Sequence, residues 1–182
     1  MKYIFDFDDV LFDNTKQFKE HMYLCLEKVG IPRNIAETYY EEVRENGFSI
    51  KNFVSVLLSR GKITEIEGME LCKKIMAENK NFANTKLIEK IKNLGKENCF
   101  IVTHGLNDYQ LDKINSIDIL PLFNEIITVQ GSKKEAVEAI CAKYKNEEVL
   151  FIDDKTKHFE SLDFDKYPNL KTILYTGQKL DF

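Results

Sequence analysis

The chain opens with the stretch Tyr3-Ile4-Phe5-Asp6-Phe7-Asp8-Asp9-Val10-Leu11-Phe12-Asp13, in which an apolar run leads directly into a group of aspartates. An isolated ionised carboxylate at the end of a buried strand is costly unless a cation or hydrogen-bond donors satisfy it. Two or three carboxylates together indicate a hard divalent metal, for which oxygen atoms are the preferred ligands. The stretch therefore predicts a strand at residues 2–6 that ends in a chemically active site.

Similar combinations of an apolar run and polar side chains follow later in the chain. The apolar residues 149–152 are followed directly by a second pair of aspartates, and the apolar residues 100–102 are followed by a threonine. Two lysines open a predicted helix after residue 132. In chain order these motif residues are Thr103, His104 and Gly105, then Lys133 and Lys134, then Asp153 and Asp154. An acidic pair, a hydroxyl group, a lysine and a second acidic pair thus occur in that order.

The composition is that of an ordinary globular protein, with 43% hydrophobic and 31% charged residues over 182 positions. This length allows one good core and a small appended domain. The formal net charge of -4 and the pI near 5.5 argue against nucleic acid or an anionic membrane as a partner. No apolar run approaches the roughly 20 residues of a membrane-spanning helix, and Asp6 comes too early for a signal peptide, so we expect a cytoplasmic protein. Because Cys25, Cys72, Cys99 and Cys141 lack a Cys-x-x-Cys spacing, we interpret them as reduced thiols.

Five short apolar runs predict strands, at residues 2–6, 99–103, 125–129, 149–152 and 171–175. Most of these runs are continuously apolar rather than alternating, which is typical of parallel strands covered on both faces by helices. The intervening stretches agree, since residues 85–94 and 133–144 carry apolar side chains at helical spacing. We therefore expect an α/β fold with a doubly wound parallel sheet.

The interval from residue 14 to residue 83 contains no convincing strand and at least four helical patterns. These patterns begin near residues 18, 34, 49 and 64, and the last opens with Thr64 and Glu67 at the spacing of a capping box. A single crossover between strands does not need this much helix. We therefore expect a small all-helical domain at residues 14–83, inserted into an α/β core domain made of residues 1–13 and 84–182.

The predicted strands place their polar residues at one edge of the sheet. In an open α/β sheet, the loops at the carboxyl ends of the strands meet in one crevice. We therefore expect Asp6, Thr103 and the pair at residues 153–154 to share a pocket with a lysine from the start of a helix. Together they supply a nucleophile, ligands for a metal such as Mg²⁺, hydrogen-bond donors and an acid, which are the requirements of phosphoryl transfer.

The ordered set resembles the four motifs of the haloacid dehalogenase-like (HAD) hydrolase superfamily, most of whose members are magnesium-dependent phosphatases. Residues 6–11 are similar to its first motif, Asp-x-Asp-x-[Thr/Val]-Leu, and residues 101–103 resemble the second. Lys133 or Lys134 resembles the third motif, and residues 151–154 resemble the double-aspartate form of the fourth. The helical insertion lies where the family places its first type of cap domain, so the resemblance implies a Rossmann-like core with a small helical cap.

The resemblance also implies a role for each matching residue. Asp6 would be the nucleophile that forms an aspartyl-phosphate, and Asp8 would protonate the leaving oxygen and later activate water. Thr103 would hydrogen-bond the phosphoryl group, and the lysine would neutralise charge between nucleophile and phosphate. We favour Lys133 over Lys134, because a buried apolar stripe then follows it in helical register. The residues expected to bind Mg²⁺ are Asp6, Asp8, Asp153 and Asp154, and those expected to bind substrate are Thr103, His104, Gly105, Lys133 and Lys134.

The fourth motif leaves the division of labour between its two aspartates open. Consecutive strand residues point to opposite faces, so both can serve one metal only if the chain leaves strand geometry at Asp153. Some members of the superfamily carry a further acid several residues later, but here position 157 is lysine and position 158 is histidine. We interpret His158 as a surface residue.

We expect a magnesium-dependent phosphatase that acts on a small phosphorylated metabolite, such as a sugar phosphate, a nucleotide or an organic-acid phosphate. A phosphomutase would use the same residues. Two non-enzymatic alternatives are a receiver-like signalling module and a phosphate-binding module. The motif order argues against a receiver, whose acceptor aspartate follows the third strand, and the intact acid, hydroxyl and lysine set argues against a purely binding role.

Overall fold

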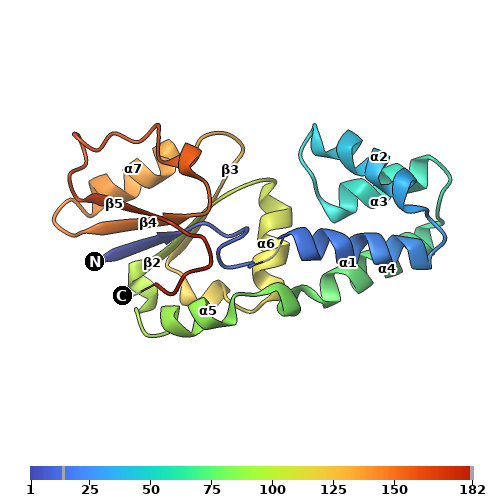
Figure 1. Cartoon of the computed structure of the whole chain (residues 1–182), viewed down its shortest axis with the longest axis horizontal. Coiled ribbons are helices and arrows are strands. Elements are labelled where there is room, and N and C mark those ends of the chain that lie inside the picture. The colour runs from blue at the N-terminus through green and yellow to red at the C-terminus, as the bar shows by residue number, and fades with distance from the viewer. Residues whose placement is uncertain (14, 181–182) are drawn as a thin grey trace. The chain divides into compact units, whose positions relative to one another are not determined.

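The computed structural model describes residues 1–13 and 15–180 of the chain (Figure 1). By their internal contacts these residues form two compact units. The first unit contains residues 1–13, 83–104 and 118–180 and includes all the strands, whereas the second contains residues 15–82 and 105–117 and is helical.

The first unit is built on one five-stranded sheet with the order β3-β2-β1-β4-β5, in which every neighbouring pair is parallel. Each strand begins and ends within one residue of a predicted strand. Helix α7 lies on one face of the sheet and α5 on the other (Figure 1), which confirms the predicted doubly wound α/β fold. The elements of this unit are β1 (Lys2–Phe5), α5 (Thr85–Ile91), η2 (Lys96–Asn98), β2 (Cys99–His104), η3 (Leu120–Leu122), β3 (Glu125–Val129), α7 (Lys134–Lys143), β4 (Val149–Asp153), η4 (Thr156–His158) and β5 (Leu170–Leu174).

The face of the sheet toward α7 holds a large apolar core. Ile4, Phe100 and Phe151 contribute to it from three adjacent strands, and Val137 contributes from α7. Side chains two residues apart along a strand share a face of the sheet. Asp153, two residues beyond Phe151 in β4, is therefore directed to the face on which α7 begins.

Within the described residues, the second unit contains the four helices predicted between residues 14 and 83 and one helix from later in the chain. They are α1 (Thr15–Lys28), α2 (Arg33–Arg44), α3 (Ile50–Ser59), α4 (Glu65–Ala77) and α6 (Asn107–Ser116), together with the short helix η1 (Asn79–Phe82). The predicted capping box opens α4. Thr64 Oγ1 accepts a hydrogen bond from the Glu67 N–H at 3.3 Å, and Glu67 Oε2 accepts one from the Thr64 N–H at 2.8 Å.

Helix α6 has no counterpart among the predicted helices. Two of its three buried side chains, Gln110 and Lys113, are polar, which weakens the apolar pattern that identifies a helix. The structure groups residues 105–117 with the helical unit, although the sequence suggested that they belong to the core domain. One contact that holds them there is the ion pair between Lys51 of α3 and Asp112 of α6, whose Nζ and Oδ2 atoms are 2.8 Å apart.

The cysteines match the prediction of reduced thiols. Cys25, Cys99 and Cys141 are buried, Cys72 is partly buried, and all four are free. Across the described ranges, no helix combines the length and the apolar character that crossing a membrane requires.

Candidate active site

Asp6 and Asp153 lie side by side at the carboxyl ends of two neighbouring strands. Asp6 directly follows β1, Asp153 ends β4, and Phe5 pairs with Ile152 between these strands. The Asp6 N–H donates to the carbonyl oxygen of Ile152 at 2.8 Å, which fixes the backbone of Asp6 against β4. The parallel register therefore joins two acidic motifs that almost the whole sequence separates.

Lys133 connects the two carboxylates. Its Nζ atom is 2.7 Å from Asp6 Oδ1 and 2.6 Å from Asp153 Oδ2, and its side chain is 1% exposed. Lys133 is the residue before α7, on the face to which Asp153 is directed. Lys134 is partly exposed, and its Nζ is 3.7 Å from Glu138 Oε1. The geometry thus separates the two adjacent lysines, and only Lys133 joins the buried carboxylates.

The carboxylate of Asp6 is held through one of its two oxygens. Oδ1 accepts a hydrogen bond from the Phe7 N–H at 2.7 Å and also contacts Lys133. Both contacts fall on the same oxygen, and they fix the orientation of the Asp6 carboxylate.

Asp153 is bound by two further donors. The Lys155 N–H donates to Oδ1 at 2.9 Å, and Nδ1 of His158 donates to Oδ2 at 2.8 Å. The interpretation of His158 as a surface residue is wrong, because its side chain is only 16% exposed and contacts this buried carboxylate. The signal available in the sequence was its position five residues after Asp153, which a short turn such as η4 brings back to the strand end.

When Asp6 and Asp153 are both ionised, they carry one more negative charge than the Lys133 ammonium between them balances. Burial raises the pKa of Asp6 to about 7. Lys133 opposes this rise, and the carboxylates of Asp153 and Asp8 add to it. Burial alone would also raise the pKa of Asp153, but Lys133 and His158 outweigh it and hold that pKa below its ordinary value. Burial lowers the pKa of His158, so its imidazole is neutral at pH 7.

These groups fit a divalent cation. One ligand atom from each of Asp6, Asp153 and His158 can be chosen so that all three lie within 4.8 Å of one another. Carboxylate oxygens are suitable ligands for Mg²⁺, and a cation would relieve the excess negative charge. The other two expected ligands lie outside this group of three. Asp8 is partly buried in the turn after β1, and Asp154 pairs with Lys155 at 3.1 Å.

The second motif lies next to Asp6, at the end of β2. Phe5 pairs with Ile101, so Thr103 lies two residues beyond the partner of Phe5 on the neighbouring strand. Thr103 is fully buried, and within the described chain its Oγ1 atom has no hydrogen-bond partner. A buried hydroxyl without a partner is unusual, and this one is available to hydrogen-bond a polar ligand. His104 is exposed, and its Nε2 is 3.0 Å from the carbonyl oxygen of Gln130. Gly105 has φ +144° and is the first residue of the second segment of the helical unit.

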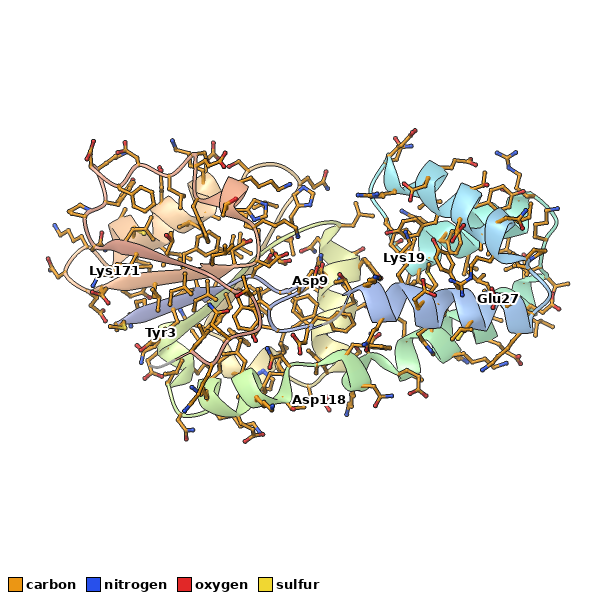
Figure 2. The ribbon with its side chains drawn as sticks, in the orientation of Figure 1. Tyr3, Asp9, Lys19, Glu27, Asp118 and Lys171 are labelled. Atoms are coloured by element: carbon orange, nitrogen blue, oxygen red, sulfur yellow. The ribbon has the colours of Figure 1, made fainter. Side chains whose placement is uncertain are left out.

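The turn after β1 carries Asp8 and Asp9 beyond the end of the strand, where Figure 2 labels Asp9. The carbonyl oxygen of Phe7 accepts hydrogen bonds from the N–H groups of Leu11 and Phe12, at 3.0 and 2.9 Å. Asp9 has φ +60°, and its N–H donates to the carbonyl oxygen of Phe12 at 2.8 Å. The turn is thus a tightly bonded structure that sets where Asp8 lies.

Known proteins share this fold. The sequence model of the haloacid dehalogenase-like hydrolase family matches residues 3–162. A solved structure assigned as a haloacid dehalogenase-like hydrolase, from Burkholderia xenovorans, superimposes with a TM-score of 0.69 at 15% identity, over 93% of this chain and 79% of that chain. No curated protein sequence gives a significant match.

Two further solved structures are similar. One is assigned as a β-phosphoglucomutase from Thermotoga maritima, with a TM-score of 0.53 and 16% identity over 98% of this chain and 88% of that chain. The other is YfnB from Bacillus subtilis bound to magnesium, assigned as a HAD-hydrolase, with a TM-score of 0.50 and 19% identity over 94% of this chain and 84% of that chain. At these identities the structures support the fold, while the family match extends over most of the sequence. The chain belongs to the haloacid dehalogenase-like hydrolase family.

Proposed function

We propose that this hydrolase is a magnesium-dependent phosphatase of a small phosphorylated metabolite, such as a sugar phosphate, a nucleotide or an organic-acid phosphate. The observation that carries the proposal is the buried Lys133 ammonium between Asp6 and Asp153, with the Thr103 hydroxyl on the adjacent strand. This arrangement offers a nucleophile, a positive charge and a hydrogen-bond donor at one edge of the sheet. A phosphate monoester needs all three.

In the proposed first step, Oδ2 of Asp6 attacks the phosphorus atom. A bond forms between that oxygen and phosphorus, the bond to the leaving oxygen breaks, and Asp8 gives its proton to the leaving oxygen. Oδ1 stays bonded to the Phe7 N–H and Lys133, so the carboxylate does not rotate as it reacts. Thr103 Oγ1 donates to a phosphoryl oxygen, which satisfies its unused hydrogen-bonding capacity.

In the second step, Asp8 accepts a proton from water as the water oxygen attacks the phosphorus of the aspartyl-phosphate. The bond to Asp6 breaks, phosphate leaves, and both aspartates return to their starting states. Mg²⁺, when bound, supplies positive charge that neutralises the phosphoryl oxygens. Asp6 and Asp153 would hold it, with Asp8 and Asp154 as the further oxygen donors that the family resemblance implies. His158 orients Asp153 through its Nδ1 hydrogen bond.

The proposal is tested by phosphate release from p-nitrophenyl phosphate with and without Mg²⁺. We expect release that depends on Mg²⁺ and is abolished by Asp6→Asn, a substitution that keeps the shape of the side chain and removes the nucleophilic carboxylate. Asp165→Asn is the matched control, because it makes the same change at an exposed aspartate to which the site gives no role, and it should retain activity within about twofold. A panel of sugar phosphates, nucleotides and organic-acid phosphates then identifies the substrate class.

Two outcomes would contradict the proposal. Equal phosphate release from the wild type and from Asp6→Asn would exclude Asp6 as the nucleophile. Conversion of a sugar phosphate into an isomer, without free phosphate, would identify a phosphomutase instead.

A further inference from the structure

Both the oxygen and the nitrogen of the Asn84 side-chain amide form hydrogen bonds within the α/β unit. It is 7% exposed and precedes α5. Its Oδ1 accepts the Leu87 N–H at 3.1 Å, and its Nδ2 donates to the carbonyl oxygen of Val10 at 2.9 Å and to Tyr175 Oη at 2.7 Å. Its backbone N–H donates to the carbonyl oxygen of Leu11 at 2.8 Å. Both N–H bonds of this amide group are therefore committed.

The groups that Asn84 binds lie in the first acidic motif or contact the second. Val10 and Leu11 lie in the turn that carries Asp8, and the Tyr175 N–H donates to the carbonyl oxygen of Asp153 at 2.8 Å. One buried side chain therefore connects the turn after β1 with the residue that anchors the end of β4. These contacts lie wholly within the α/β unit.

The choice of asparagine is not explained by its position at the start of α5. Aspartate, serine and threonine cap helices about as well, because the cap needs only an acceptor oxygen. These side chains have no NH₂ group and cannot donate to both Val10 and Tyr175. The two donated bonds, rather than the cap, therefore account for asparagine at this position.

We propose that Asn84 is a positioning residue for the general acid and base Asp8, and this inference rests on the proposed phosphatase function. Asn84 acts by holding the carbonyl groups of Val10 and Leu11, and so the turn in which Asp8 lies, in a fixed place relative to Asp153. The role predicts a specific defect. Without Asn84, protonation of the leaving oxygen slows more than the attack by Asp6 does.

The test compares two esters that differ in their need for an acid. Phenyl phosphate has a poor leaving group that requires protonation, whereas p-nitrophenyl phosphate has a good one. Asn84→Asp keeps the cap and the size of the side chain but removes both donated bonds. With Mg²⁺ present, we expect this variant to lower kcat/KM, which reports the first step, about tenfold on phenyl phosphate and about twofold on p-nitrophenyl phosphate.

Two further variants make the test specific. Tyr175→Phe removes one of the two acceptors and should change the ratio of the two kcat/KM values in the same direction, by about threefold. It carries the test if Asn84→Asp does not fold. Asn98→Asp is the matched control. Asn98 donates to the Leu94 carbonyl oxygen at 2.7 Å and lies before β2, at the opposite end of the strands, so its loss should leave the ratio unchanged.

The outcomes separate this inference from the proposed function. If the wild type hydrolyses neither ester, the phosphatase proposal fails and the role of Asn84 fails with it. If the wild type is active and the variants at residues 84 and 175 lower both kcat/KM values equally or leave them unchanged, only the role of Asn84 is refuted.

Discussion

The free energy of unfolding of the metal-free wild-type protein should fall as the pH rises toward 7. Asp6→Asn should remove this fall. Burial raises the pKa of Asp6 from its ordinary 3.8 to about 7 in the folded chain. Between these two values the folded protein binds more protons at this site than the unfolded chain does. Stability contributed by the protonated carboxyl is therefore present at low pH and is lost as the pH rises through this window.

The size of the effect follows from the two pKa values. A difference of one pKa unit corresponds to about 1.4 kcal/mol. Because the unfolded carboxyl is already mostly ionised at pH 5, the part of the effect that lies between pH 5 and pH 7 is about 2 kcal/mol. Asparagine cannot ionise, so Asp6→Asn lacks this contribution while keeping the Phe7 and Lys133 contacts close to their present geometry.

The assay is urea denaturation of both proteins in EDTA at pH 5, 6 and 7. The unfolding free energy of the wild type minus that of Asp6→Asn should fall by about 2 kcal/mol from pH 5 to pH 7. Saturating Mg²⁺ should reverse the trend for the wild type, because the cation binds the ionised carboxylate. Parallel pH curves for the two proteins in EDTA would refute the raised pKa of Asp6 and the charge excess inferred from it.

Three further substitutions are expected to separate structural from chemical roles. Lys133→Met leaves two buried carboxylates without their cation. It should lower the unfolding free energy by about 3–5 kcal/mol, measured by denaturation, and phosphate release at least 100-fold, measured by an ester assay. Unchanged stability would contradict the buried ion pair. Thr103→Val should leave the unfolding free energy unchanged or raise it by up to about 1 kcal/mol, because the lost hydroxyl has no partner within the described chain. It should nevertheless lower kcat/KM about 100-fold. A large loss of stability would argue against an unpartnered hydroxyl at Thr103. Thr64→Ala should cost about 1 kcal/mol through the lost capping box without altering activity, and thermal denaturation beside the same assay checks both points.

Much of the fold was predictable because local patterns carried it. The continuous apolar runs predicted every strand to within one residue, and the helical periodicity and the Thr64–Glu67 box predicted α1 to α4. Helix α6 was missed, since Gln110 and Lys113 interrupt its apolar face. Their burial depends on neighbours that are distant in the sequence, and a local pattern does not record it.

The sequence alone determined the residue types and the order of the motifs: a carboxylate, a hydroxyl, a lysine and a second carboxylate, each placed after an apolar run or at a helix start. This was sufficient to predict that Asp6 and the pair at residues 153–154 would meet, because parallel strands bring their carboxyl ends to one edge. Only the tertiary structure decided which neighbours join them. Lys133 rather than Lys134 reaches both carboxylates, His158 returns to bind Asp153, and Asn84 bonds the turn after β1. These choices depend on side-chain direction and on distances of about one hydrogen bond, which are set by how the helices and turns pack around the strands.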